Sequence, residues 1–270
     1  MKSRLSSFLL LLIFLIGLSL MLYPTFSDWW NSFHQSRAVQ TYRQAVKELP
    51  DYGVFFRDAQ AYNDELSQLN FPLMYYDRVE GYENLLNAAG NGILGTVKIP
   101  KIQVNLPIYH GTSDSVLQVA VGHLEGSSLP TGEKGTHCVL SAHRGLPSAR
   151  LFTDLDKLEP GDRFTLTVLD RELTYEVDRI LVVEPQQVQS LYTVEGEDLC
   201  TLMTCTPYGI NTHRLLVRGR RVYPEKAPAA LQITADAQPL SAAPAAAILA
   251  SPVLISLLLI LLIPKRRYDP

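Results

Sequence analysis

The chain has 270 residues and a formal net charge of −3, with 24 basic and 27 acidic side chains. Since nucleic-acid-binding surfaces are dense in lysine and arginine, this balance argues against nucleic acid as a partner. The three cysteines cannot all pair within one chain, so at least one thiol lies outside any internal disulfide.

Two uncharged, mostly apolar segments lie near the ends of the chain. Residues 5–23 form the first and residues 245–263 the second, each 19 residues long. At about 1.5 Å per residue, a helix of this length spans roughly 28 Å, which is close to the thickness of a bilayer core. Both segments are therefore predicted to be transmembrane helices.

Basic residues flank these segments on their outer sides. Lys2 and Arg4 precede the first segment, and a basic tail at residues 264–270 follows the second. The positive-inside rule then places both termini in the cytoplasm and the body outside the cell membrane, as a two-pass protein. A cleaved signal peptide is the alternative for the first segment, but its long apolar run and the lack of a nearby cleavage motif favour a retained anchor.

Residues 24–91 are predicted to be a mainly helical region. Apolar side chains recur every three or four residues from Val39 to Leu49 and from Phe55 to Leu69, and Pro72 ends the second run. This spacing is typical of amphipathic helices. We expect a helical pair that packs between the membrane and the body.

From Gly92 the pattern changes to short β-rich runs separated by Gly, Pro and Asp turns. Seven runs are predicted as strands: Ile93–Ile99, Val104–Ile108, Thr136–Ala142, Phe164–Leu169, Leu173–Val183, Leu199–Cys205 and Leu215–Val222. Seven or eight strands at this spacing indicate a closed barrel or a sandwich over residues 92–222. Residues 223–244, rich in Pro and Ala, are predicted to be an extended linker.

Three residues offer the chemistry of a thiol acyl-transferase. Cys205 ends a predicted strand, His143 follows another, and Arg214 begins a third. A thiolate can attack a carbonyl, a histidine can move protons, and a guanidinium can stabilise charge on the carbonyl oxygen. Each also has a structural alternative: a buried cysteine, a surface histidine and an ordinary ion pair. Four other arginines compete with Arg214 on composition: Arg144, Arg218, Arg220 and Arg221.

Other chemistries have weaker support in the sequence. The remaining histidines do not fall at zinc-ligand spacings, so neither a metal nor another cofactor is expected. Ser141 does not lie in a Gly-x-Ser-x-Gly motif, which argues against a serine hydrolase. Cys200 and Cys205 are five positions apart on one predicted strand and therefore face opposite sides, so a disulfide between them is not expected.

Several segments resemble those of the class C, pilus-assembling sortases of Gram-positive bacteria. Thr201–Cys205 with Arg214 matches the sortase motif Thr-Leu-x-Thr-Cys followed by arginine, and residues 205–208 and 211–219 match the class C extension of it. Residues 142–147 and 151–155 match the segment that carries the family's histidine. The resemblance extends from about Gly92 to Arg220.

The resemblance implies an eight-stranded sortase β-barrel that catalyses transpeptidation without a cofactor. Cys205 would attack the Thr carbonyl of a Leu-Pro-x-Thr-Gly-like sorting signal, His143 would protonate the leaving amine, and Arg214 would hold the oxyanion. Thr204 and Asn211 are expected to bind substrate. The acyl group would pass to a lysine amine of a pilin, the alternatives being a cell-wall peptide amine or a tethered module without catalysis.

One feature of many class C sortases is missing, namely a lid with an Asp-Pro-aromatic motif. The only Asp-Pro pair is Asp269-Pro270 at the far end of the chain. Tyr75, Tyr76 and Asp77 are candidates for a degenerate lid, with a plain linker as the alternative. The sequence therefore predicts weak or no self-inhibition.

Overall fold

A computed structural model describes residues 2–223 of the chain. Nearly all of the predicted Pro/Ala linker, the second apolar segment at 245–263 and the basic tail lie outside the described residues. The chain divides into two compact units, and among the described residues the division falls between Ser27 and Asp28.

Helix α1 is a single helix that runs from Lys2 to Lys47. The part from Phe8 onward contains a window that is long and apolar enough to cross a membrane, and none of that window is buried. It is the one helix of this kind within residues 2–223. The sequence predicted an anchor and then a separate helix, but α1 continues through Pro24, although proline lacks the N–H for the usual helical hydrogen bond.

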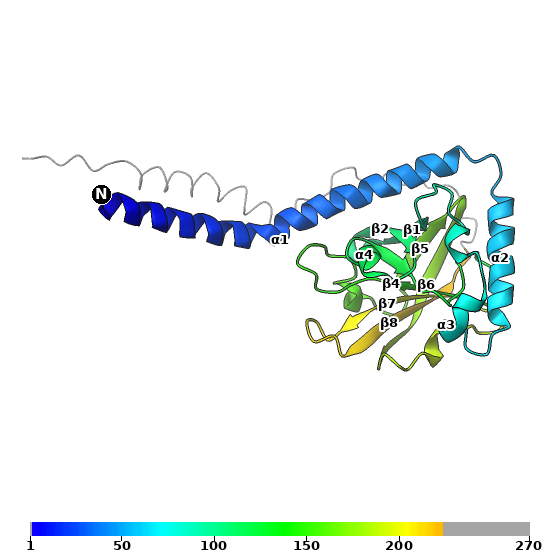
Figure 1. The fold of residues 1–270 in the computed structure, drawn as a ribbon. Helices are drawn as coiled ribbons and strands as arrows, with labels where there is room; N and C mark the ends of the chain where they lie inside the picture. Colours follow the sequence, from blue (N-terminus) through cyan, green and yellow to red (C-terminus); the bar gives the residue numbers. More distant parts are fainter. Residues whose placement is uncertain (1, 224–270) are drawn as a thin grey trace, which may run out of the picture. The chain divides into compact units, whose positions relative to one another are not determined.

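The end of α1 and helix α2 (Gly53–Ser67) form the predicted helical pair beside the barrel (Figure 1). Val39, Tyr42 and Val46 of α1 are buried. The Tyr42 hydroxyl donates a hydrogen bond to the carbonyl of Leu94 at 3.0 Å and accepts one from the amide of Leu169 at 2.7 Å. A buried hydroxyl with both partners fixes the helix against β1 and the turn between β5 and β6.

Eight strands close into a barrel in the order β1-β2-β3-β4-β7-β8-β6-β5, which confirms the expected barrel over a sandwich. They are β1 (Ile93–Ile99), β2 (Val104–His110), β3 (Val121–His123), β4 (Thr136–Ser141), β5 (Arg163–Val168), β6 (Arg171–Val183), β7 (Asp198–Thr206) and β8 (His213–Arg221). The sequence missed only β3, because three residues are too few to show alternation.

Side chains of β4, β7 and β8 alternate between two apolar clusters on opposite faces of the sheet. Leu140, Leu202 and Val217 belong to the main core. Their neighbours belong to a second, smaller cluster, which we call the outer-face cluster; its members are Leu73, Leu124, Val139, Leu181, Val183, Leu191, Met203 and Leu216. Successive side chains of a strand point to opposite faces of the sheet, and this alternation produces the two clusters.

Candidate active site

Cys205 lies one residue from the end of β7 and is partly exposed. It shares a strand face with Met203 of the outer-face cluster, whereas Leu202 and Thr204 are buried on the other face. Beyond the strand, the amides of Ile210 and Asn211 both donate to the carbonyl of Pro207, at 3.1 and 3.0 Å. The thiol is therefore presented at the rim of the barrel, next to a tight turn.

Arg214 is the cross-strand partner of Cys205 in the antiparallel pair of β7 and β8. Residues that are directly opposite in such a pair project from the same face. The Arg214 guanidinium donates to the carbonyls of Asn211 and His213, at 3.3 and 3.2 Å. No ion pair of Arg214 with a carboxylate is found within residues 2–223, so its charge is not neutralised there.

The competing arginines are engaged elsewhere. Arg218 pairs with Asp178 at 2.5 Å, and Arg220 pairs with Glu197 at 3.2 Å. Arg221 packs against the rings of Tyr175 and Tyr223. Arg214 is thus the arginine that the strand register places beside the thiol.

His143 follows β4, which runs parallel to β7 with Ser141 level with Met203. Two hydrogen bonds extend this pairing beyond the strand: Ala142 N donates to Met203 O at 3.2 Å, and Thr204 Oγ1 donates to Ala142 O at 2.8 Å. Continuing the register by two positions brings His143 level with Cys205. The structure therefore gathers His143, Cys205 and Arg214 at one end of three adjacent strands.

The loop after His143 packs against the loop after Cys205. Gly145 has φ of +77°, and a Cβ there would lie 2.9 Å from the ring of Tyr208. Only glycine combines this backbone conformation with so close an approach. Within the histidine loop, the amide of Phe152 donates to the carbonyl of His143 at 3.2 Å.

Arg144 connects the same two loops with its side chain, which is 9% exposed. Its guanidinium pairs with Asp156 at 2.5 Å and donates to Thr206 Oγ1 at 3.4 Å. Sequence reasoning considered Arg144 only as a rival to Arg214, and its position beside His143 was the one available signal. The structure shows it to be a bridge between the residues that follow His143 and Cys205.

Comparison with known proteins agrees with this geometry. Residues 97–222 match the model of the sortase domain. Sortase C1 of Streptococcus agalactiae is 47% identical, with a TM-score of 0.65 over 70% of this chain and 100% of that structure. The chain belongs to the class C sortases. Sortases are cysteine transpeptidases.

Two further relatives place this sortase within the family. A pilus-related sortase C of group B Streptococcus is 40% identical, with a TM-score of 0.59 over 68% of this chain and 97% of that structure. Sortase D of Bacillus subtilis is 31% identical over 47% of this chain and 63% of its own length. This chain spans less than two thirds of the length of the curated relatives that it matches.

Helix α1 contacts the histidine loop of this sortase directly. Asn31 Nδ2 donates to the carbonyl of Ser148 at 2.8 Å, and Asp28 Oδ1 accepts from the amide of Arg150 at 3.0 Å. Sequence reasoning did not find these contacts, since they join residues 117 and 122 positions apart. The helix that carries the predicted anchor therefore also holds the loop that begins at His143.

The remaining predicted site residues have different surroundings. Thr204 is buried, and its hydroxyl donates a hydrogen bond to the carbonyl of Ala142. Asn211 is exposed in the turn after Cys205, with φ of +61°. A role of either residue in substrate binding remains a proposal. Because the Thr204 hydroxyl is bonded to Ala142, only its backbone is available to a substrate.

The lid candidates lie at the end of helix α3 (Pro72–Tyr75) and in the following turn, Tyr76–Arg78. Tyr76 and Asp77 are exposed, and the ring of Tyr75 faces the Arg78 guanidinium at 4.3 Å. The residue of this segment that packs on the outer-face cluster is Leu73. Leu73 is thus the part of this segment that is packed, whereas Asp77 is exposed.

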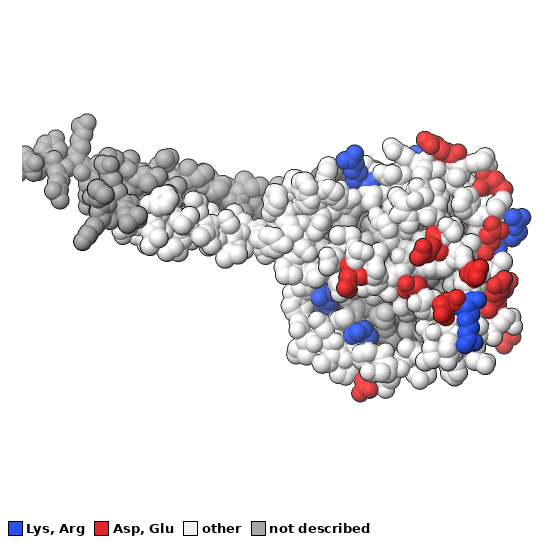
Figure 2. All heavy atoms as spheres, viewed as in Figure 1, with Lys and Arg blue, Asp and Glu red and all other residues white. Residues whose placement is uncertain are grey.

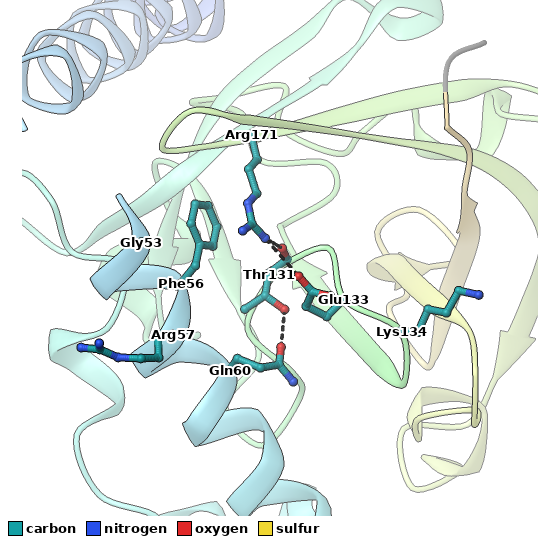
Figure 3. A pocket seen from close by; sticks show the side chains of 8 residues that line it. All are labelled: Gly53, Phe56, Arg57, Gln60, Thr131, Glu133, Lys134 and Arg171. Atoms are coloured by element: carbon teal, nitrogen blue, oxygen red, sulfur yellow. Dashed lines mark hydrogen bonds and ion pairs between the residues drawn. The ribbon is translucent and has the colours of Figure 1, made fainter. Parts of the chain in front are cut away.

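A cavity of about 540 Å³ lies between α2 and the barrel (Figure 3). Three of its lining residues, at positions 131, 133 and 134, precede β4, so it lies at the opposite end of that strand from His143. There Arg171 stacks on the ring of Phe56 at 3.7 Å and donates to the carbonyl of Thr131 at 2.7 Å. Gln60 accepts a hydrogen bond from the Thr131 hydroxyl at 2.8 Å. These groups satisfy one another and join the helix to the barrel, so we assign the cavity no part in the chemistry.

On the face of the described residues that Figure 2 shows, acidic and basic side chains are mixed and form no continuous basic surface. A phosphate backbone therefore has no matching surface on that face.

Proposed function

We propose that this sortase cleaves a Leu-Pro-x-Thr-Gly-like sorting signal and transfers the acyl group to a lysine amine of a pilin. The proposal is carried by one observation: the register of β4, β7 and β8 brings His143, Cys205 and Arg214 to the same rim of the barrel. Nucleophile, proton carrier and oxyanion donor are the groups that acyl transfer requires.

In the first half-reaction, the Cys205 thiolate attacks the carbonyl carbon of the signal's threonine. The Arg214 guanidinium, which has no carboxylate partner within residues 2–223, stabilises the negative charge on the oxygen of the tetrahedral intermediate. The C–N bond to glycine then breaks, and His143 gives its proton to the departing amine. The products are a thioacyl enzyme and the released C-terminal fragment.

In the second half-reaction, the acceptor amine attacks the thioacyl carbon. His143, now neutral, accepts a proton from the amine, and the C–S bond breaks to restore the Cys205 thiolate. The proton given up in the first step is thus recovered in the second. An isopeptide bond joins the two substrates.

The outer-face cluster supports binding of an extended peptide with an apolar residue. Its partly buried members include Met203, two residues before Cys205, and Val183, the register partner of Arg214. An apolar floor with a polar end is typical of ligand sites. The leucine of the signal would pack on this floor while its threonine reaches the thiol.

The proposal also covers the acceptor, which is a pilin, and the membrane topology. The relative from group B Streptococcus is a pilus-related enzyme, which favours a pilin lysine over a cell-wall amine. Sortases are membrane-associated with an extracellular catalytic domain. We propose that residues 5–23 and 245–263 anchor the protein as two transmembrane helices, with both termini in the cytoplasm.

The test uses the full chain in membranes with a sorting-signal peptide and two competing acceptors, a pilin domain and a cell-wall peptide amine. Cys205→Ala should abolish cleavage, and Cys200→Ala, five residues upstream on the opposite face, should retain it. A pilin conjugate confirms the proposal, whereas a cell-wall conjugate overturns the choice of acceptor. Cleavage by Cys205→Ala at the wild-type rate would overturn the enzymatic mechanism and favour a tethered binding module.

A further inference from the structure

Two cysteines that the proposed chemistry does not use face each other inside the barrel. Cys138 on β4 is the register partner of Cys200 on β7. Both are free thiols, and their exposed fractions are 2% and 0%. They share the main core rather than the outer-face cluster.

The strand register brings this pair within the span of a disulfide. Neighbouring strands lie about 4.7–4.9 Å apart, and disulfides join Cα atoms that are roughly 4.4–6.8 Å apart. Level residues on adjacent parallel strands also project to the same side of the sheet. Cys138 and Cys200 therefore meet both the distance and the direction that a disulfide needs.

In the closed barrel, the Cys138 thiol interacts with Cys200. Burial opposes ionisation of this thiol, but its interactions with Cys200 and His123 outweigh burial and hold its pKa below the usual value. Burial raises the pKa of the Cys200 thiol well above its usual range. These shifts belong to the closed barrel, where the two thiols interact with each other, and the proposed link rests on the register of β4 and β7.

We propose that Cys138 and Cys200 form a disulfide that joins β4 to β7 when the chain meets a disulfide-bearing oxidant outside the membrane. The Cys138 thiolate attacks one sulfur of the oxidant, which forms a mixed disulfide and releases one thiolate. Cys200 loses its proton and attacks the Cys138 sulfur, which releases the second thiolate. Two protein thiols are oxidised, and one external disulfide is reduced to two thiols.

Since both sulfurs are buried in the closed barrel, the exchange takes place before the barrel closes during folding. The disulfide would then be sealed in the core, protected from external thiols. Once β4 and β7 have paired, Cys205 lies on the other face of β7 and points away from both sulfurs. The pairing therefore leaves the nucleophile as the odd, free thiol.

The position of this link relates it to the active site. Cys138 lies five residues before His143, and Cys200 lies five residues before Cys205. The link would join the two strands that carry the proton carrier and the nucleophile, whose register the strand pairing already sets with both thiols free. The bond also closes a long loop, which lowers the conformational entropy of the unfolded chain.

The experiment counts thiols in the full chain, extracted in detergent from cells that export it, with iodoacetamide present at lysis. After denaturation without reductant, we expect one alkylated cysteine, Cys205, and a linked peptide pair that contains Cys138 and Cys200. The same result is expected after refolding with oxidised glutathione. Alkylation of both Cys138 and Cys200 in both samples, or a disulfide that includes Cys205, would overturn the proposal.

Thermal unfolding provides a second readout with a matched variant. Reductant, added to unfolded protein before refolding, should lower the melting temperature of the wild-type chain by about 10 °C. It should not change that of the Cys138→Ala/Cys200→Ala variant, even if this variant is less stable at the outset. Equal effects of reductant on both proteins would contradict the proposed link.

Discussion

The hydroxyl of Thr204 donates a hydrogen bond of 2.8 Å to the backbone carbonyl of Ala142. Thr204 directly precedes Cys205, and Ala142 directly precedes His143. The bond is inaccessible to solvent, since Thr204 is 1% exposed, so water cannot replace it. It therefore couples the two backbone segments that present the nucleophile and the proton carrier, and we regard Thr204 as a positioning residue.

Replacing Thr204 by Val keeps the shape of the side chain but leaves the Ala142 carbonyl without this partner. An unsatisfied buried acceptor costs about 1–3 kcal/mol, and the His143 segment is expected to shift as a result. We expect kcat for peptide cleavage to fall roughly tenfold with little change in KM, as steady-state kinetics would show. Thr204→Ser should restore most of the rate. A Val variant with the wild-type kcat would show that the bond serves stability alone.

Arg144 provides a second test of how the two loops are held together. Arg144→Met removes both the pair with Asp156 and the hydrogen bond to Thr206, at a cost of about 1–2 kcal/mol. The matched control is Arg150→Met in the same loop, because Arg150 pairs with Asp154 but is 61% exposed.

We expect Arg144→Met to lower kcat about tenfold and Arg150→Met to leave kcat nearly unchanged, since exposed pairs contribute little. Arg144→Lys should restore the charge but not the contacts with both Asp156 and Thr206, so we expect it to restore only part of the rate. Equal losses of kcat in Arg144→Met and Arg150→Met would show that the charge of the loop matters rather than the contacts of Arg144 with Asp156 and Thr206.

Asp198 gives the stability of the barrel a pH dependence. The carboxyl lies buried at the start of β7, where it accepts a hydrogen bond from the Tyr175 hydroxyl at 2.9 Å. Burial raises its pKa to about 6, from 3.8. The folded state therefore binds this proton more tightly than the unfolded state, and the stabilisation is lost as the pH rises through about 6.

Asp198→Asn removes the charge and retains an acceptor for Tyr175. We expect the variant to exceed the wild type in unfolding free energy by up to about 3 kcal/mol near pH 8, and by little near pH 4. Urea unfolding at a series of pH values measures this difference. Burial also lowers the pKa of His137 to about 4, which destabilises both proteins as the pH falls and so cancels in the comparison. A difference that does not vary with pH would contradict the assignment.

The sequence predicted the parts of this site that depend on local pattern. Alternation of apolar residues located β7 and its neighbours, and hence the strand-end positions of Cys205 and His143. The motif around Cys205 and Arg214 then identified the family. Both signals are contained in short stretches of chain, which is why one sequence was sufficient to read them.

The sequence could not predict contacts that arise only when distant segments meet. The bond from Thr204 to Ala142 and the bridge from Arg144 to Thr206 join residues 62 positions apart in each case. Nothing in the alternation of either strand specifies that β4 and β7 are neighbours. For the same reason, the pairing of Cys138 with Cys200 was visible only in the sheet register.

The contact of α1 with the histidine loop leads to a prediction about the helix itself. Asn31→Ala removes the hydrogen bond to the Ser148 carbonyl, and its loss is expected to cost about 1 kcal/mol of loop stability. Gln35→Ala is a close control, because it removes an amide-to-carbonyl bond of the same 2.8 Å length that goes to Val119 instead.

We expect kcat/KM to fall about twofold to fivefold in Asn31→Ala and to stay near the wild-type value in Gln35→Ala. Hydrogen exchange at the Arg150 amide, which is bonded to Asp28, should be faster in Asn31→Ala. Unchanged exchange there would indicate that the loop keeps its conformation without the helix.

The predicted weakness of self-inhibition can be tested at Leu73. This side chain belongs to the outer-face cluster, whereas Tyr76 and Asp77 are exposed. Opening the segment requires the exposure of one partly buried leucine, so a polar residue there should increase the fraction of chains in which the rest of the outer-face cluster is uncovered. We expect Leu73→Ser to raise the cleavage rate of a sorting peptide by about twofold to fivefold at low substrate concentration.

Met74→Ser is the matched control, because Met74 is adjacent and 67% exposed, and we expect no change in rate. Tyr76→Ala/Asp77→Ala should also leave the rate unchanged, since both side chains are exposed. A sharp increase in cleavage by that double variant would show that these residues form a working lid and that self-inhibition is strong. Inactivity of Leu73→Ser would instead mean that Leu73 supports the outer-face cluster and does not cover it.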